Sequence, residues 1–449
     1  MKPKLLLLIC FFMLAGSVML TESIFSQSVN FRFNNYFYAW QRIDSLSNES
    51  SAKTTHLRGY QNYLLEVKGN RWSFNTLAQT EEDIIAKSGR GFAYRFYNAY
   101  VKGSDLFGVL DVKLGRQSIF AGTGRGTLDG LNLKVKAGKF KEYQFTVYGG
   151  ALAPYSYEFS NYPEVKNNYH FGGMFSYYGV RDLIASVSYS NKKRTPEPYT
   201  TYRADSVYNL VERTITFDGP AEQLAGIDVN YTYLMKHNFY LKAYFDMTHK
   251  KLYRAEANVR VQINNELRGF VEYLYRQPYY NYNSIFWVFN YNQNQEISGG
   301  LDYTLKNGIN IYGRAGIVLY KKSEVYPTSP GPTKNNSVKI QAGFSHPNYG
   351  INITRYMGYT GESDGVSAYI QKDIYKDKVS GSASVNYSNY KLGDYEVDKV
   401  NAFSGQLGIT YRPMPQFSID VQGQFLINRI YKSDARCLVG FSYWLFKKL

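Results

Sequence analysis

Hydrophobic and polar residues alternate along most of this chain. In segment 239–248, every second position from Phe239 is apolar or small, and the positions between them, from Tyr240, are polar or charged. Segment 253–263 repeats this arrangement. An amphipathic helix would need apolar positions every three to four residues. The alternation therefore predicts strands of about ten residues, each with one apolar and one polar face.

The connections between these strands also alternate in length. Short turns are expected at 69–70, 181–182, 236–238, 306–308, 346–348 and 413–415. Mostly longer polar loops are expected near 44–53, 81–90, 152–166, 195–221, 280–294, 323–334 and 391–399. Short periplasmic turns and longer extracellular loops are typical of outer-membrane barrels. The chain is therefore predicted to be all-β, a single transmembrane antiparallel β-barrel of about 22 strands, within a range of 16 to 22, from near Val29 to near Phe446.

The first residues have the pattern of a secretory signal peptide. Lys2 and Lys4 precede an apolar run over 5–20, and a more polar stretch leads to an expected cleavage site near Ser26–Gln27. The run is shorter than the ~20 residues that a spanning helix usually needs. Residues 1–26 are thus predicted to be a signal peptide and 27–449 an outer-membrane barrel.

Composition narrows the class of protein. Aromatic residues make up 17% of the 449 residues, 45 of them Tyr, which argues against a disordered chain. The only cysteines are Cys10 and Cys437, so neither a disulfide framework nor a cysteine-paired metal site is expected. The five histidines are scattered without metal-ligand spacing. We therefore expect no enzyme activity and no cofactor.

Residues 114–130 read LGRQSIFAGTGRGTLDG. The Gly115-Arg116-Gln117 and Asp129-Gly130 segments resemble those of porin-like barrels of the alginate-export type, and this resemblance implies an outer-membrane channel. Independently, the glycines predict a loop at 115–126, between strands at 107–114 and 128–135, that folds inward. Arg116, Arg125 and Asp129 would then form a pore constriction. The alternative is a glycine-rich hairpin with exposed charges. Strict alternation places Arg116 on the lipid face unless a bulge near Gly115 turns it inward.

Charged residues of the polar faces are expected to line the lumen, because a charge on the lipid face is costly. The predicted lumen charges are Lys113, Lys134, Lys136, Lys242, Arg254, Arg260, Arg268, Glu272, Arg276 and Arg314. The formal net charge is +16, and a basic lumen favours anions. The alternative is that these charges only form cross-strand ion pairs, such as Arg268 with Glu272.

Segment 279–291 is rich in aromatic residues. It contains Tyr282, Phe286, Trp287 and Phe289. Such side chains gather in the girdle of a barrel at the membrane interface. They also offer flat faces to sugars, so both interpretations stay open.

Together these patterns predict an outer-membrane porin for passive diffusion of small polar or anionic solutes. Two alternatives are a channel that exports or takes up an acidic polysaccharide, and a barrel scaffold that sheathes a partner such as an electron-transfer cytochrome. The expected partners are outer-membrane lipid and lipopolysaccharide, the solutes and the barrel assembly machinery. A homo-oligomer is left open, and nucleic acid is not expected.

Overall fold

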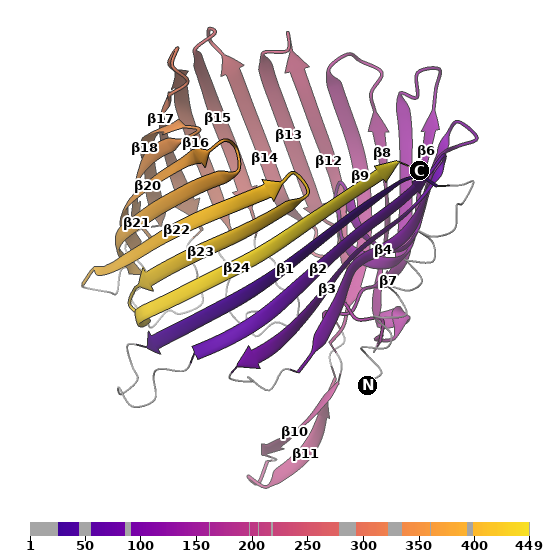
Figure 1. Cartoon of the computed structure of the whole chain (residues 1–449). Helices are drawn as coiled ribbons and strands as arrows, with labels where there is room; N and C mark the ends of the chain where they lie inside the picture. The colour runs from indigo at the N-terminus through magenta and orange to yellow at the C-terminus, as the bar shows by residue number, and fades with distance from the viewer. Residues whose placement is uncertain are drawn as a thin grey trace.

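The strands of this chain form one closed antiparallel barrel. The structure is a computed structural model, and it describes residues 26–44, 55–85, 91–160, 162–196, 198–204, 206–216, 219–277, 293–321, 335–359, 361–392 and 398–448. Twenty-two strands join in one sheet, and the last strand pairs with the first. Figure 1 shows them as a tilted ring of long strands, with β24 beside β1. The predicted fold class and the predicted count of about 22 strands are confirmed.

The first half of the barrel runs from β1 to β9. Its strands are β1 (Ser26–Asp44), β2 (Thr55–Gly69), β3 (Trp72–Ile85), β4 (Ala93–Leu106), β5 (Leu110–Ala121), β6 (Gly124–Ala137), β7 (Tyr143–Leu152), β8 (Asn168–Tyr177) and β9 (Leu183–Arg194). A 3₁₀ turn, η2 (Val165–Asn167), precedes β8.

The remaining strands complete the ring. They are β12 (Glu222–Tyr233), β13 (His237–Asp246), β14 (Lys251–Gln262), β15 (Leu267–Arg276), β16 (Asn294–Thr304), β17 (Asn310–Tyr320), β18 (Asn336–His346), β19 (Tyr349–Gly358), β20 (Gly361–Tyr375), β21 (Val379–Leu392), β22 (Val400–Met414), β23 (Phe417–Ile427) and β24 (Tyr431–Lys448).

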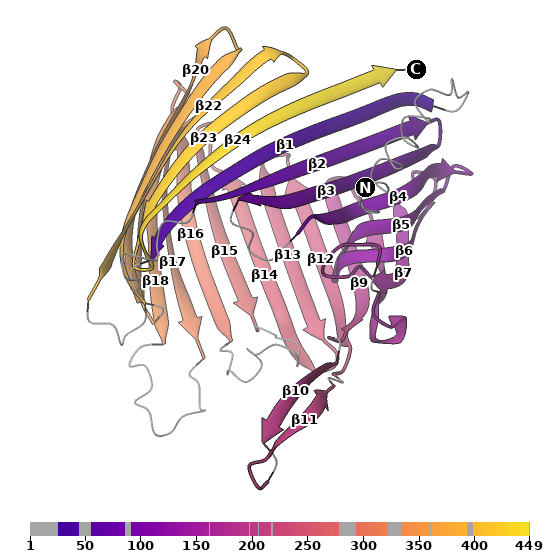
Figure 2. The same ribbon diagram turned by 60° about the horizontal axis from the view of Figure 1, so that its bottom comes forward.

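The two ends of the barrel differ in the length of their connections. One end, the turn end, has connections of a few residues, such as those after β2, β12 and β18. The other end, the loop end, has mostly longer ones, and the connection between β9 and β12 contains a separate hairpin, β10 (Tyr199–Ala204) with β11 (Leu210–Ile215). This hairpin projects away from the barrel (Figure 2). The predicted alternation of short and long connections is confirmed.

The two faces of each strand differ as the alternation predicts. In β13 the outward Leu241 is 52% exposed, whereas the inward Lys242 is 7% exposed. Leucine, valine, isoleucine and phenylalanine side chains are exposed around the outer surface in the same way. A soluble protein rarely exposes so continuous an apolar surface, but a barrel surrounded by hydrocarbon requires one.

Two predicted segments lie outside the described residues. Residues 1–25, nearly all of the predicted signal peptide, are among them, and β1 begins at Ser26. Tyr282, Phe286, Trp287 and Phe289 belong to the other segment, 278–292. Signal-peptide cleavage and the role of the aromatic segment stay predictions.

Candidate pore and its lining

The hairpin of β5 and β6 leaves the wall and leans into the barrel. Pairing between β4 and β5 stops at Ala99 with Arg116, whereas pairing between β5 and β6 continues to Ala121 with Gly124. At the hairpin tip, the Thr123 backbone N–H donates to Ser188 Oγ of β9 at 3.0 Å, and the Thr123 hydroxyl donates to the Leu224 carbonyl of β12 at 3.4 Å. The tip has therefore crossed the inner faces of β7 and β8.

An apolar cluster lies between the hairpin and the wall. Ile119 and Leu128 of the hairpin are 0% exposed, and they pack with Ala121, Tyr148 and the partly buried Met174. Burial of one large aliphatic side chain stabilises a fold by about 1.5–3 kcal/mol. The hairpin is thus packed against the wall as part of the fold.

Glycines permit the bend at the hairpin base. Gly115 has a φ of +121°, a conformation that side chains with a Cβ rarely adopt. Gly130 lies opposite Gly115 on β6, and a Cβ there would come within 2.2 Å of the Gly149 carbonyl oxygen of β7. The glycines of the 114–130 stretch are therefore needed for conformation and for close packing of strands.

Arg116 and Asp129 hold the base of the hairpin. The Arg116 side chain is 0% exposed, and its Nε and Nη2 donate to the two Asp129 carboxylate oxygens at 2.8 and 2.9 Å. It also donates to the carbonyls of Phe96, Tyr157 and Glu158 at 2.6–3.1 Å.

Tyr162, in the connection between β7 and β8, completes this cluster. Its hydroxyl accepts from Arg116 and donates to Asp129, both at 2.6 Å. Burial and the Asp129 carboxylate raise the pKa of Tyr162 to about 12. The Phe96 N–H donates to the Tyr157 carbonyl at 2.9 Å. This connection therefore takes the place beside β4 that β5 has left.

The structure corrects the predicted constriction in two respects. Segment 115–126 is not a glycine-rich loop, because β5 continues to Ala121 and β6 begins at Gly124. Arg116 and Asp129 bind each other at the base of the hairpin. Because the Arg116 side chain is buried there, it is not available to a solute. Arg125 is exposed near the tip, close enough to Tyr244 and Tyr253 to act on them electrostatically.

Ion pairs cross the inner wall from β12 to β18. Lys242 lies 3.7 Å from Asp228 and 3.8 Å from Glu256, and Arg254 also pairs with Glu256. Further along, the pairs are Arg260 with Glu272 at 3.4 Å, Arg314 with Asp302 at 3.6 Å, and Lys339 with Glu296 at 2.8 Å. The expected pair of Arg268 with Glu272 is wrong, because Glu272 contacts Arg260 and Asn258 instead.

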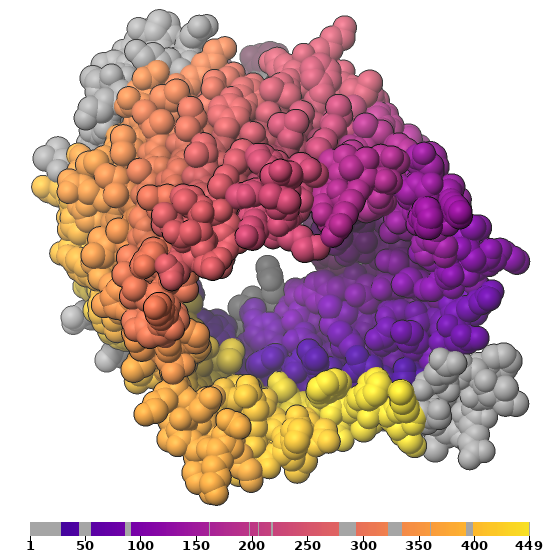
Figure 3. Space-filling model, turned by 90° about the horizontal axis from the view of Figure 1, so that it is seen from above, coloured from indigo at the N-terminus to yellow at the C-terminus, as the bar shows by residue number. Residues whose placement is uncertain are grey.

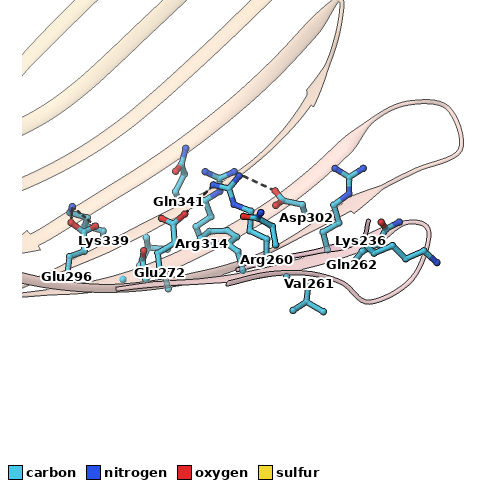
Figure 4. Close-up of a pocket in the computed structure, with 18 of the residues that line it drawn as sticks. Lys236, Arg260, Val261, Gln262, Glu272, Glu296, Asp302, Arg314, Lys339 and Gln341 are labelled. Atoms are coloured by element: carbon cyan, nitrogen blue, oxygen red, sulfur yellow. Dashed lines mark hydrogen bonds and ion pairs between the residues drawn. The ribbon is translucent and has the colours of Figure 1, made fainter. Parts of the chain in front are cut away.

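A recess of about 610 Å³ lies along this part of the wall. Its charged lining residues are Lys236, Arg260, Arg268, Arg314, Lys339, Glu272, Glu296 and Asp302. In Figure 4 the side chains of Arg260, Arg314 and Glu272 point to one side of the sheet, and Val261 points to the other. Five cations face three carboxylates, so the recess is basic on balance even with its ion pairs formed.

The other predicted lumen charges also lie on the inward face. Arg276 is directly opposite Arg254. Lys113, Lys134 and Lys136 are on β5 and β6, and Lys136 pairs with Asp111 at 2.8 Å. The passage between these walls is open in the space-filling view from the turn end (Figure 3). The structure thus places a charged lining around an open lumen.

The inner wall also carries an aromatic stack that was not predicted from the sequence. Tyr38 stacks on Trp40 with ring centroids 5.1 Å apart, and Trp40 stacks on His56 of β2 at 4.8 Å. Arg58 lies over the Trp40 ring at 5.8 Å. The sequence did contain an indication of this stack, since residues 36, 38 and 40 are all aromatic and share one face of the strand.

Two kinds of feature are absent from the described part of the chain. No group of three or more histidine, cysteine, aspartate or glutamate side chains could hold a metal ion there. No helix among those residues is long and apolar enough to cross a membrane.

Comparison with known proteins gives structural similarity only. No family model matches the sequence, and no curated protein matches it. Acinetobacter baumannii OccAB4 matches at 9% identity and a TM-score of 0.44, over 94% of this chain and 99% of that one. Pseudomonas aeruginosa OpdK, solved with vanillate, matches at 6% identity and a TM-score of 0.43, over 94% of this chain and 98% of that one. OccK3 (OpdO) of the same organism matches at 8% identity and a TM-score of 0.41, over 93% of this chain and 95% of that one. By its own strand pairing, the chain is a closed antiparallel barrel of 22 strands, the porin-like architecture that its sequence predicts.

Proposed function

We propose that this protein is an outer-membrane pore for passive diffusion of small polar solutes, with a preference for anions. The observation that carries the proposal is the open, basic lumen inside a barrel whose outer surface is apolar. Fixed charges in a lumen with low-dielectric walls raise the local concentration of ions of opposite sign.

The β5–β6 hairpin narrows the passage, and ion selectivity depends on a narrow passage. Screening limits the reach of a fixed charge to about 8–10 Å at moderate salt, so charges act best where the passage is narrow. The hairpin occupies part of the lumen, and Arg125 is exposed near its tip. Arg125 is therefore our candidate for the charge nearest to passing ions.

Planar-bilayer conductance tests this proposal. In a potassium chloride gradient, the reversal potential of the wild-type pore should show anion preference, and the preference should fade at high ionic strength. Arg125→Glu should reduce or reverse it, whereas Arg181→Glu, at the exposed turn after β8, is the matched control and should change it little. A wild-type pore that prefers cations would refute the electrostatic argument.

If the Arg125→Glu pore keeps its anion preference, the charges of the barrel wall determine the selectivity. Arg254, Arg260, Arg268 and Arg276 would then be the next charges to reverse.

A channel for an acidic polysaccharide is the second candidate. The Tyr38–Trp40–His56 stack favours it, because aromatic rings bind the apolar faces of sugars. Arg58, which lies over the Trp40 ring, is paired with Asp83. Blocking of the chloride current by oligo-uronates, weakened by Trp40→Ala, would support this candidate. Block that is unchanged in Trp40→Ala would remove the reason for it.

A further inference from the structure

Three lysines from adjacent strands lie together on the inner wall near the turn end. Lys102 of β4 is directly opposite Lys113 of β5. Lys134 of β6 is opposite Asp111, two positions from Lys113 on the same face of β5. All three side chains are half-buried. Facing side chains of neighbouring strands have Cβ atoms about 4.5–5.5 Å apart, and diagonal ones about 7–8 Å, so the three long side chains can reach one region of the lumen.

Within the described residues, the three lysines of this cluster lack the carboxylate partners that many inward cations have. Elsewhere, inward cations such as Lys242 and Lys339 have a carboxylate within 4 Å. Among the residues that the structure describes, no ion pair within 4 Å involves Lys102, Lys113 or Lys134.

Two carboxylates near the cluster act on other groups. Asp111 accepts from the Lys136 ammonium group and from the Asp105 N–H, each at 2.8 Å. Glu66 lies on β2 and acts on Tyr100, the ring over which the Lys113 ammonium group sits at 5.4 Å.

Facing like charges cost stability, and Asp111 and the Tyr100 ring offset only part of that cost. Lys113 is repelled by both Lys102 and Lys134, and Asp111 is the one described carboxylate that attracts it appreciably. Like charges directly opposite each other in a sheet destabilise it. An anion bound between the three would remove the repulsion, and a doubly charged one would remove more of it than a carboxylate.

We propose that Lys102, Lys113 and Lys134 form a binding site for a phosphate-type oxyanion at the turn end of the lumen. Each ammonium group supplies three donors and no acceptor, which suits a tetrahedral dianion approached from three strands. The site rests on the pore proposed above, because the ligand reaches it through the lumen. The ligand is either inorganic phosphate or the phosphate group of a monoester.

Current block in a planar bilayer tests the site. Inorganic phosphate added at constant ionic strength should lower the chloride current in a saturable way. A charge-assisted hydrogen bond contributes about 1.5–3 kcal/mol, so each of Lys102→Gln, Lys113→Gln and Lys134→Gln should raise the half-blocking concentration about tenfold or more. Lys139→Gln removes the same charge from the exposed turn after β6 and is the control, with no change expected.

Two further measurements make the result decisive. The triple Lys→Arg variant keeps the charges and should keep the block, which separates loss of the site from misfolding. Glucose 6-phosphate, with glucose as the neutral control, distinguishes the sources: block by both phosphates assigns the site to the free group, and block by the ester alone assigns it to a phosphorylated solute.

The outcomes separate this proposal from the proposed function. A phosphate block that persists unchanged in the folded triple Lys→Gln variant overturns the site. A wild-type pore that prefers cations overturns the anion preference, and calorimetric titration of the detergent-solubilised protein with inorganic phosphate then decides the site by itself. Absence of binding by wild type in that titration would also overturn it.

Discussion

Arg116→Met should destabilise the barrel strongly, although residue 116 is far from both ends of its strand pair with β6. The substitution keeps much of the side-chain volume and removes the charge. The Asp129 carboxylate, 19% exposed, loses both of its Arg116 bonds, and the carbonyls of Phe96, Tyr157 and Glu158 each lose a donor.

The expected magnitude follows from these losses. Removal of one partner from a buried ion pair costs about 3–5 kcal/mol when the other charge stays buried without compensation. Here the Tyr162 hydroxyl still donates to Asp129 and offsets part of this cost. The freed carbonyls add to this cost, but water entering at the bend offsets part of it. We therefore expect the free energy of unfolding to fall by about 3–5 kcal/mol.

Urea unfolding in phospholipid vesicles measures this change, and a heat-modifiable band on unboiled gels reports whether the barrel still closes. Arg125→Met is the matched control, because an exposed substitution usually changes stability by about 0.5 kcal/mol or less. The double variant Arg116→Met/Asp129→Leu removes both charges and should recover part of the loss. A loss below about 1 kcal/mol in Arg116→Met, with unchanged single-channel conductance, would refute the idea that this pair holds the hairpin in place.

Three further predictions concern the outer face, the bend and the wall. Leu241→Arg places a charge in hydrocarbon and should cost about 2–4 kcal/mol in urea unfolding in vesicles, unless this part of β13 faces water. Gly130→Val should disrupt the bend and weaken the heat-modifiable band, whereas Gly423→Val, where a Cβ meets nothing within 4 Å, should leave it intact; equal behaviour of the two would contradict the packing argument. Glu296→Gln frees Lys339, 2.8 Å away, and should increase anion preference in reversal-potential measurements, with a shift toward cations as the contrary result.

The strand pattern could be predicted from the sequence because each face of a strand meets a different solvent. Leu241 meets hydrocarbon and Lys242 meets the lumen, so the period of two is imposed at nearly every position. Residues that tolerate a positive φ mark some short connections, as Asp182 and Gly308 do with φ of +60° and +82°. Strand number and face therefore follow from local sequence.

The hairpin could not be predicted in the same way, because its bend depends on contacts between distant residues. Alternation places Arg116 on the outer face, and the pairing of β5 with β6 continues past it without a bulge. The whole hairpin turns inward instead, and Tyr157, Glu158 and Tyr162 contact Arg116 on the face that lipid would otherwise contact. Glycines at 115 and 130 indicated irregular backbone, but they do not distinguish a loop from strands in close approach.

The seam between β1 and β24 has a consequence for how the protein is made. It pairs Ser28 with Lys448 and continues to Asp44 with Tyr431, and one of its side-chain contacts, Trp444 to Asn30, joins residues 414 positions apart. The first strand therefore has no partner on one side until the ribosome has finished the last. A sheet that formed before β24 joined it would have two long unpaired edges, each able to pair with another chain. Ring closure must be a late, all-or-none step, and the nascent protein depends on something that shields both edges until they meet.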